Sequence, residues 1–267
     1  MVDLTEMAVR LYRKYLSDNR GGSGEEIQIL LSGAQAVAVA EASICESAVL
    51  GGDEELLRSW QEQIDQHGQN VFGKPLTSIV GNSARSSVAS AIGLSLAGKR
   101  ATTFVTGQNV GAAQDLLFSA AGRHLPLVIH LTNIAMPEQG IAGGSGHEGY
   151  HLSSETGVFT LFAENAQQAA DFSFIARRVA ESALVPGLVA IDAGETARSV
   201  QDVSILNPSQ VRQFIGPNDV NIDASTAAQK LLFGETRLPV PRWHDVDRPV
   251  VAGALFDAPT YSVGATR

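Results

Sequence analysis

The chain has 267 residues, 44% of them hydrophobic, and a formal net charge of −9. A chain of this size can bury a sizeable core, so we expect one large α/β domain rather than two small ones. The negative charge opposes binding to a phosphate backbone, and nucleic acid is not expected as a partner. The single cysteine, Cys45, excludes an internal disulfide and any four-cysteine iron–sulfur or zinc centre built from this chain alone.

The sequence shows neither a membrane-spanning segment nor a signal peptide. No apolar run reaches the ~18 residues that a spanning helix requires. The first residues also lack a short apolar core followed by a small-residue cleavage site. We therefore expect a cytoplasmic protein without a membrane partner.

The first segment, 1–26, is predicted to be an amphipathic helix on a glycine-rich hinge. Leu4, Met7, Leu11 and Leu16 fall at helical spacing, and the stretch 19–24 ends the helix. From residue 27 onward, short β-rich runs alternate with helical windows. The expected strands are 27–31, 76–80, 101–107, 126–132, 158–162 and 187–193. The expected helices are 34–42, 54–66, 84–98, 110–123 and 166–183, followed by two short ones at 208–216 and 225–234.

Continuously apolar strands are typical of a parallel sheet that is covered by helices on both faces. We predict a doubly wound, mostly parallel α/β domain over 27–235, beginning with the strand at 27–31. The Pro-rich, aperiodic stretch 236–267 is predicted to be an extended C-terminal tail or linker. Ligands of such folds bind outside the carboxyl ends of the strands, so the candidate loops are 106–109, 131–140 and 192–199.

The pentapeptide HEGYH at 147–151 matches the H-E-x-x-H signature of zinc metalloproteases. The signature works only on a helix, where both histidines reach one zinc ion. Gly143, Gly144, Gly146 and Gly149 favour a loop instead, because glycine costs about 0.8–1 kcal/mol relative to alanine in a helix. No third ligand has motif support. We expect a polar surface loop and no metal site, and keep zinc hydrolysis as a remote alternative.

Other motifs give weak signals. The chain lacks a dinucleotide G-x-G-x-x-G, a P-loop and a G-x-S-x-G elbow. Gln108 and Asn109 follow a predicted strand and could hydrogen-bond a ligand, although a polar helix N-cap explains them as well. Ser83 is interpreted first as a helix cap, His130 as a core histidine and Cys45 as a small buried side chain.

The stretch 70–133, from NVFGKPLTSIV to LVIHLTN, resembles the first domain of pyruvate:ferredoxin and related 2-oxoacid:ferredoxin oxidoreductases. The resemblance lies in order and spacing and extends over roughly 27 to 267, including SGAQAVAVAEAS, ELLRSWQEQ and the segment around HEGYH. It implies a fold like the pyrimidine domain of thiamine-diphosphate enzymes, the domain that faces the aminopyrimidine. It also implies that HEGYH is a loop carrying a histidine and an acid.

Three positions depart from this family. The resemblance implies a glutamate just before the 84–98 helix that protonates N1′ of the pyrimidine, and Ala84 stands there. It implies a Thr-Pro pair and an arginine that hold the 2-oxoacid carboxylate, where this chain has Ala48 and Val49, and Ile134. These apolar side chains can neither donate a proton nor form a charge-assisted hydrogen bond. We therefore predict no catalytic residue.

A shift of one or two positions in the alignment with the family would place Arg85 or Glu46 at an expected catalytic or binding position. The candidates for cofactor binding are Gln108, Asn109, His147 and Glu148. No cofactor is expected in this chain alone, and thiamine diphosphate with Mg²⁺ would require a partner domain that supplies the diphosphate site.

We expect a degenerate domain that acts as a structural or docking unit of a larger redox enzyme, for example of the sulfite reductase flavoprotein type. The alternative is a working pyrimidine-domain subunit of a thiamine-diphosphate-dependent 2-oxoacid:ferredoxin oxidoreductase-like complex. The expected partners are other domains or subunits, in an oligomer or a hetero-complex. The helix at 4–16 and apolar tail residues such as Val240 and Trp243 indicate this, because they need a surface to cover them.

Overall fold

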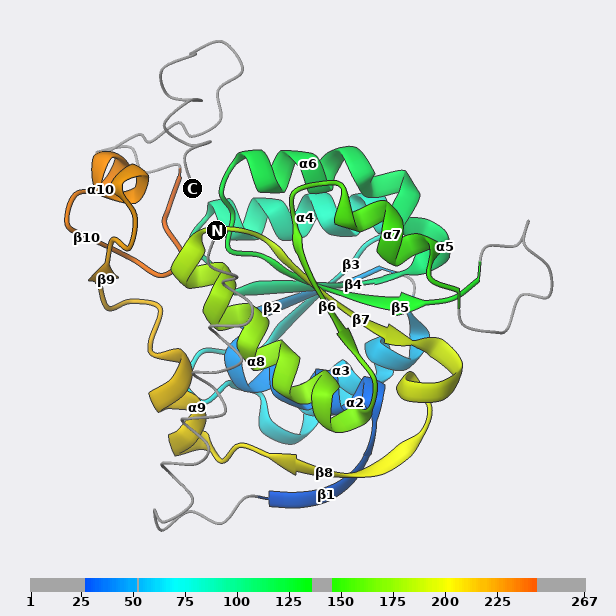
Figure 1. Cartoon of the computed structure of the whole chain (residues 1–267). Helices are drawn as coiled ribbons and strands as arrows, with labels where there is room; N and C mark the ends of the chain where they lie inside the picture. The colour runs from blue at the N-terminus through cyan, green and yellow to red at the C-terminus, as the bar shows by residue number, and fades with distance from the viewer. Residues whose placement is uncertain (1–26, 52, 136–145, 244–267) are drawn as a thin grey trace.

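A parallel sheet of six strands forms the centre of the molecule (Figure 1). The computed structural model describes residues 27–51, 53–135 and 146–243. The strand order is β3-β2-β4-β5-β7-β6, and every neighbouring pair is parallel. The strands are β2 (Ser47–Leu50), β3 (Thr77–Val80), β4 (Ala101–Thr106), β5 (Val128–Asn133), β6 (Phe159–Ala163) and β7 (Gly187–Asp192). The prediction of a doubly wound, mostly parallel α/β domain is confirmed.

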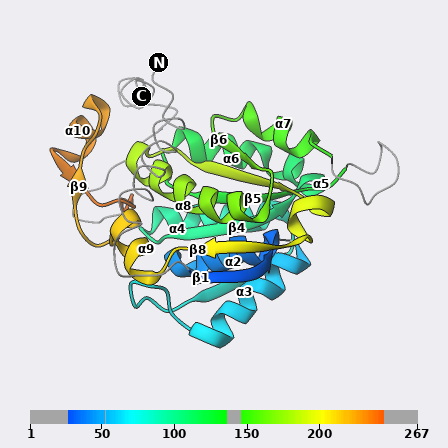
Figure 2. The ribbon, with the colours of Figure 1, turned by 60° about the horizontal axis from the view of Figure 1, so that its bottom comes forward.

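Helices cover both faces of this sheet (Figures 1 and 2). The chain moves along the sheet in one direction from β2 to β3 and returns in the other from β3 to β4. Because such crossovers are right-handed, the two connecting helices lie on opposite faces. One face carries α2 (Gly33–Ile44), α3 (Glu54–His67) and α8 (Ala166–Ala183), and the other carries α4 (Ala84–Leu96), α6 (Gln114–Gly122) and α7 (Glu148–Ser154). The four-residue helix α5 (Gly107–Val110) and a 3-10 turn (Gly111–Ala113) precede α6.

Burial explains which strands the sequence reveals. All residues of β4 and β5 are buried, as expected for central strands of a parallel sheet. The strand β2 is also fully buried, but its four residues, SAVL, are too few to show a period, and it was not predicted. At the edge, all four residues of β3 are exposed. Ser83 caps α4 through a capping box, as predicted.

The strand β1 (Ile27–Ser32) lies outside the main sheet, and its predicted place as the first parallel strand was wrong. It pairs antiparallel with β8 (Val200–Ile205) in a separate two-stranded sheet. Figure 2 shows this pair on the outer side of α2 and α8. Those helices already occupy this face of the main sheet, so β1 buries only part of its apolar surface, and Leu30 remains 70% exposed.

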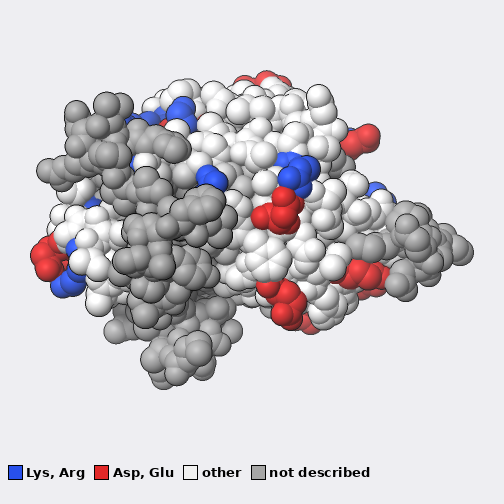
Figure 3. Space-filling view, turned by 90° about the horizontal axis from the view of Figure 1, so that it is seen from above, with Lys and Arg blue, Asp and Glu red and all other residues white. Residues whose placement is uncertain are grey.

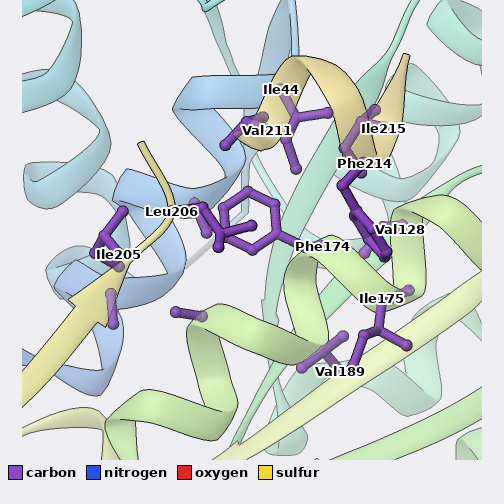
Figure 4. Close-up of a cluster of buried hydrophobic side chains, with 14 of the residues drawn as sticks. Ile44, Val128, Phe174, Ile175, Val189, Ile205, Leu206, Val211, Phe214 and Ile215 are labelled. Carbon is purple, nitrogen blue, oxygen red and sulfur yellow. The ribbon is translucent and has the colours of Figure 1, made fainter. Parts of the chain in front are cut away.

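An apolar cluster joins this outer pair to the helices (Figure 4). Phe174 of α8 is 1% exposed and lies at its centre. The cluster draws on α2, β8, α9 (Pro208–Ile215) and the main sheet. Its labelled members are Ile44, Val128, Ile175, Val189, Ile205, Leu206, Val211, Phe214 and Ile215. The cluster therefore holds β8 and α9 against the central domain.

The last described segment packs against the same domain. After α9, the chain forms β9 (Ile222–Asp223), α10 (Ala227–Phe233) and β10 (Thr236–Arg237), so both short predicted helices are present. Val240 and Trp243 are 1% and 5% exposed, and the backbone N–H of Trp243 donates to Leu96 O at 3.1 Å. The expectation that these two side chains need another surface was therefore wrong. The predicted helix at 4–16 and the tail from 244 onward lie outside the described residues.

None of the helices within the described ranges has both the length and the apolar character needed to cross a membrane.

Candidate functional site

A cavity of about 600 Å³ lies where the carboxyl ends of β2, β4, β5 and β7 meet. In the order β3-β2-β4, successive strands are added on one side of β2 and then on the other, so the strand order reverses between β2 and β4, which is the usual ligand position in open α/β folds. The cavity is lined by residues from the three segments that the sequence marked out: Thr106 at the end of β4, Thr132 and Ile134 at the end of β5, and Ala193, Ala197 and Arg198 after β7. The structure therefore brings the three predicted loops into one cavity.

The fourth wall is the start of α3, which the sequence did not mark out as part of a site. It contributes Asp53, Glu54, Glu55 and Arg58. The signal that could have revealed it is an aspartate at a helix N-cap directly after a strand. It was missed because β2, the strand before it, is too short to recognise.

Asp53 is the best-anchored polar group in the cavity. Its Oδ1 accepts hydrogen bonds from the backbone N–H groups of Glu55 and Leu56, both at 3.1 Å. Its Oδ2 accepts a hydrogen bond from the hydroxyl of Thr132. Around it, Glu55 accepts a hydrogen bond from the Ser32 hydroxyl at 3.3 Å and lies 3.7 Å from the guanidinium of the largely exposed Arg198. The cavity is therefore polar and is lined by both carboxylate and guanidinium groups.

The three positions where the family's catalytic groups were expected hold apolar side chains in different settings. Ala48 is fully buried within β2, away from any opening. Ala84 is the first residue of α4, is 4% exposed and packs into the core. Only Ile134 lines the cavity.

Neither neighbouring polar residue replaces the expected groups. Arg85 points to the surface, where it forms a bidentate ion pair with Asp115 and donates to Ala112 O. Glu46 precedes β2, at the amino end of the strand, and accepts a hydrogen bond from Asn218 Nδ2 at 2.6 Å. Shifting the alignment with the family by one or two positions therefore places neither Glu46 nor Arg85 in the cavity.

Gln108 and Asn109 support the local backbone. Gln108 Nε2 donates to Ala135 O at 3.0 Å, and Asn109 Nδ2 donates to Thr106 Oγ1 at 2.9 Å. Neither side chain lines the cavity, and the N-cap position of α5 is Thr106. The structure gives these two residues a role in holding the ends of β4 and β5.

HEGYH is helical, so its prediction as a loop was wrong. His147 is the N-cap residue of α7, and Glu148 to His151 lie within the helix. A side chain on Gly149 would clash with Gly107, because its Cβ would lie 2.6 Å from Gly107 Cα. The glycine thus allows α7 to pack closely against α5, and this tertiary contact overrides its poor helix propensity.

The two histidines of HEGYH nevertheless act separately. His147 is half exposed, and its Nε2 lies 3.1 Å from Asp192 Oδ1. One carboxylate oxygen of Glu148, Oε2, is buried without a partner among the described residues. Across the described part of the chain, no three His, Cys, Asp or Glu side chains form a group that could hold a metal ion. Neither His147 nor Glu148 lines the cavity.

A second titratable cluster is buried between α2, β5 and α8. Glu41 Oε1 accepts from His130 Nε2 at 2.7 Å, and Glu41 Oε2 accepts from Arg177 at 3.2 Å and from the thiol of Cys45 at 2.9 Å. Arg177 also donates to Ala101 O at 3.0 Å. His130 is thus a hydrogen-bonded core histidine, as predicted, whereas Cys45 is buried but polar in its contacts.

The charges of this cluster balance one another. Burial alone would raise the pKa of Glu41, but the charge of Arg177 and the hydrogen bonds from His130 and Cys45 outweigh it and lower the pKa to about 2. Burial raises the pKa of the Cys45 thiol well above its usual value, so the thiol stays protonated. Because none of these side chains lines a described cavity, the cluster is structural.

An open parallel sheet covered by helices on both faces, with a polar cavity at the carboxyl ends of its strands, defines a doubly wound α/β domain. A family model described as "Pyruvate flavodoxin/ferredoxin oxidoreductase, thiamine diP-bdg" matches residues 59–250, and the chain belongs to this family. The resemblance inferred from the sequence is confirmed.

Among curated proteins, the pyruvate synthase subunit PorA of Pyrococcus furiosus is 32% identical over 136 residues, which is 50% of this chain and 34% of that protein. The ketoisovalerate oxidoreductase subunit VorA of Pyrococcus abyssi is 26% identical over 179 residues, 67% of this chain and 40% of that protein. The chain therefore matches well under half of the length of these relatives.

A solved structure shares the fold. The 2-oxoglutarate:ferredoxin oxidoreductase from Magnetococcus marinus, with 2-oxoglutarate, coenzyme A and succinyl-CoA bound, aligns with a TM-score of 0.58 and 17% identity. The match covers 69% of this chain and 32% of that one.

One position does not fit thiamine diphosphate: at the start of α4, where the resemblance places an acid for the pyrimidine, Ala84 offers a buried methyl group.

Proposed function

We propose that this chain is a non-catalytic domain of a 2-oxoacid:ferredoxin oxidoreductase-like assembly and acts there as a structural or docking unit. The observation that carries the proposal is the loss of the acid at Ala84, where a buried methyl group cannot exchange a proton with a pyrimidine. The apolar Ala48 and Ile134 support it, since neither can bind a carboxylate. The kind of larger enzyme, whether of sulfite reductase flavoprotein type or another, and a cytoplasmic location belong to the same proposal.

The alternative is a working pyrimidine-domain subunit of a thiamine-diphosphate-dependent complex. The cavity favours it, because a volume of about 600 Å³ with polar walls is retained at the ligand position of the fold. Under this alternative, the substrate would have to react without a carboxylate clamp at Ile134, and a partner would have to supply both the diphosphate site and the missing acid.

Tight binding of thiamine diphosphate by the chain alone would contradict the non-catalytic function, whereas its absence is expected of both functions, because the alternative takes its diphosphate site from a partner. We expect the full chain, titrated by calorimetry with thiamine diphosphate and Mg²⁺, to show no binding with a dissociation constant below about 100 μM, which corresponds to roughly −5.5 kcal/mol. The variant Ala84→Glu restores an acid at this position, and its affinity for thiamine diphosphate is compared with that of the unaltered chain. Tight binding by the unaltered chain would favour the working subunit instead.

The outer surface supports a docking role. Figure 3 views the molecule from the side of α4 and α6 and shows mostly uncharged surface, although the chain carries a net charge of −9. Phe118 on α6 is 53% exposed. At the sheet edge, Ile79 and Val80 of β3 are 40% and 68% exposed, beside backbone groups that no described strand pairs. Such an edge is a site where another chain can add.

Assembly is the second test. We expect the full chain to sediment above the 28.1 kDa of one copy, or to be recovered with a partner from its native source. Val80→Lys should weaken this association, because it places a charge on the open edge, while leaving the melting temperature unchanged. Val220→Lys is the matched control, since Val220 is 55% exposed but lies outside this edge. A monomer without a partner would contradict the docking role.

A further inference from the structure

Within the cavity, three hydrogen-bond donors converge on one carboxylate, and that carboxylate belongs to the chain itself. Two donors are the backbone N–H groups of Glu55 and Leu56 at the start of α3. The third is the hydroxyl of Thr132 at the end of β5. Asp53 accepts all three and is one of the residues that line the cavity.

Helix capping explains only part of this arrangement. An N-cap aspartate needs only N–H groups of its own first turn. The Thr132 bond instead joins α3 to a strand 79 residues further along the chain. Hydroxyl groups and the N–H groups of a helix N-terminus are typical donors to anions. A free carboxylate bound beside the start of α3 would therefore need the same three donors that Asp53 uses. An anionic group of a ligand at this position would have to compete with the Asp53 side chain for the same donors.

The surroundings add to this exclusion. Glu54, which is exposed, and Glu55, which is partly buried, lie beside Asp53 and contribute negative charge. The basic side chains are exposed as well: Arg198 is 72% exposed and is associated with Glu55, and Arg58 is exposed. Ile134, directly after β5, offers no donor side chain. A second carboxylate would find the donors taken and like charges next to it.

We propose that Asp53 is a specificity-determining residue that closes this cavity to free carboxylates, including 2-oxoacids, by filling the anion position from within the chain. The inference rests on the proposed non-catalytic function and deepens it. It adds a second reason why a 2-oxoacid would not bind: the donors are already bonded to Asp53, in addition to the absence of the family's carboxylate-binding side chains.

Asp53→Gly tests the proposal directly. Glycine is a tolerated N-cap residue, so the variant should fold, and it removes the internal carboxylate. The full chain is titrated with acetate, pyruvate or 2-oxoglutarate, and binding is measured from the changes in its amide chemical shifts. Chloride keeps the ionic strength constant. We expect the variant to bind them at least about tenfold more tightly than the unaltered chain, with shifts at Glu55, Leu56 and Thr132.

Two further variants separate the causes. Asp53→Asn fills the same space without charge, so the cavity should stay closed. Thr132→Val combined with Asp53→Gly removes one donor and should abolish the gain. The proposal is overturned if Asp53→Gly binds no carboxylate, if Asp53→Asn opens the cavity equally, or if the gain survives Thr132→Val. Its failure is distinguishable from failure of the proposed function, which is judged on the unaltered chain with thiamine diphosphate.

Discussion

Glu41→Gln is expected to lower the free energy of unfolding by about 3–5 kcal/mol at pH 7. Glu41 is fully buried and is the carboxylate that pairs with the equally buried Arg177 at 3.2 Å. Glutamine keeps the shape but not the charge, so the guanidinium of Arg177 stays buried without its counter-charge. Urea unfolding measures the loss. Glu62→Gln, an exposed change on α3, is the matched control and should alter stability by less than about 0.5 kcal/mol.

A double variant tests whether charge balance is the cause. Replacing Arg177 by methionine in the Glu41→Gln background removes the uncompensated charge, and buried ion pairs are often replaced by apolar residues without loss. The double variant should therefore be more stable than Glu41→Gln alone. If it is less stable by the sum of two independent losses, the explanation by charge balance is wrong.

The pH dependence has a defined sign. The pKa of Glu41 is lowered from 4.5 to about 2 in the folded chain, so the unfolded chain binds its proton first as the pH falls. The stability from Glu41 is then fully present above pH 4.5 and is lost as the pH falls toward 2, an effect of about 3 kcal/mol. The difference in free energy of unfolding between the unaltered chain and Glu41→Gln should be constant from about pH 7 to 5 and should decrease below pH 4.5. A difference in free energy of unfolding that stays constant down to pH 3 would show that the effect does not come from the charge of Glu41.

Local patterns predicted most of the central domain, because its elements obey them. The helix at 84–98 carries its own cap in Ser83, and every residue of β4 and β5 is buried because both faces of the sheet are covered. The strand at 27–31 is also rich in apolar residues, yet its partner is β8, more than 160 residues away. Which sheet it joins depends on α2 and α8 already covering the main sheet, and no local pattern contains that information.

The candidate site was predictable in its position but not in its chemistry. The rule for strand ends identified the loops that contribute Thr106, Thr132 and Arg198. The bond between Asp53 and Thr132 spans two elements, so neither residue is conspicuous alone. HEGYH shows the opposite failure: Gly149 argued against a helix, and the close approach of Gly107 reverses that argument.

Phe174→Ala should lower the free energy of unfolding by about 3–5 kcal/mol, since it removes a large side chain that is 1% exposed and leaves a cavity behind. The ring touches the residues that hold β8 and α9 to the domain (Figure 4), so amide exchange in those elements should rise more than in β4. Phe118→Ala makes the same chemical change on α6 at a side chain that is 53% exposed, and should alter stability by less than about 0.5 kcal/mol.

The two large losses should differ in their response to pH. The cavity left by Phe174→Ala contains no titrating group, so its effect on stability should be equal at pH 7 and pH 4, and urea unfolding at both values checks this. Equal losses for Phe174→Ala and Phe118→Ala would mean that the cluster around Phe174 does not support the fold. A loss from Phe174→Ala that fades below pH 4.5 would instead show that its packing is coupled to the charged cluster of Glu41 and Arg177 in the same pair of helices, α2 and α8.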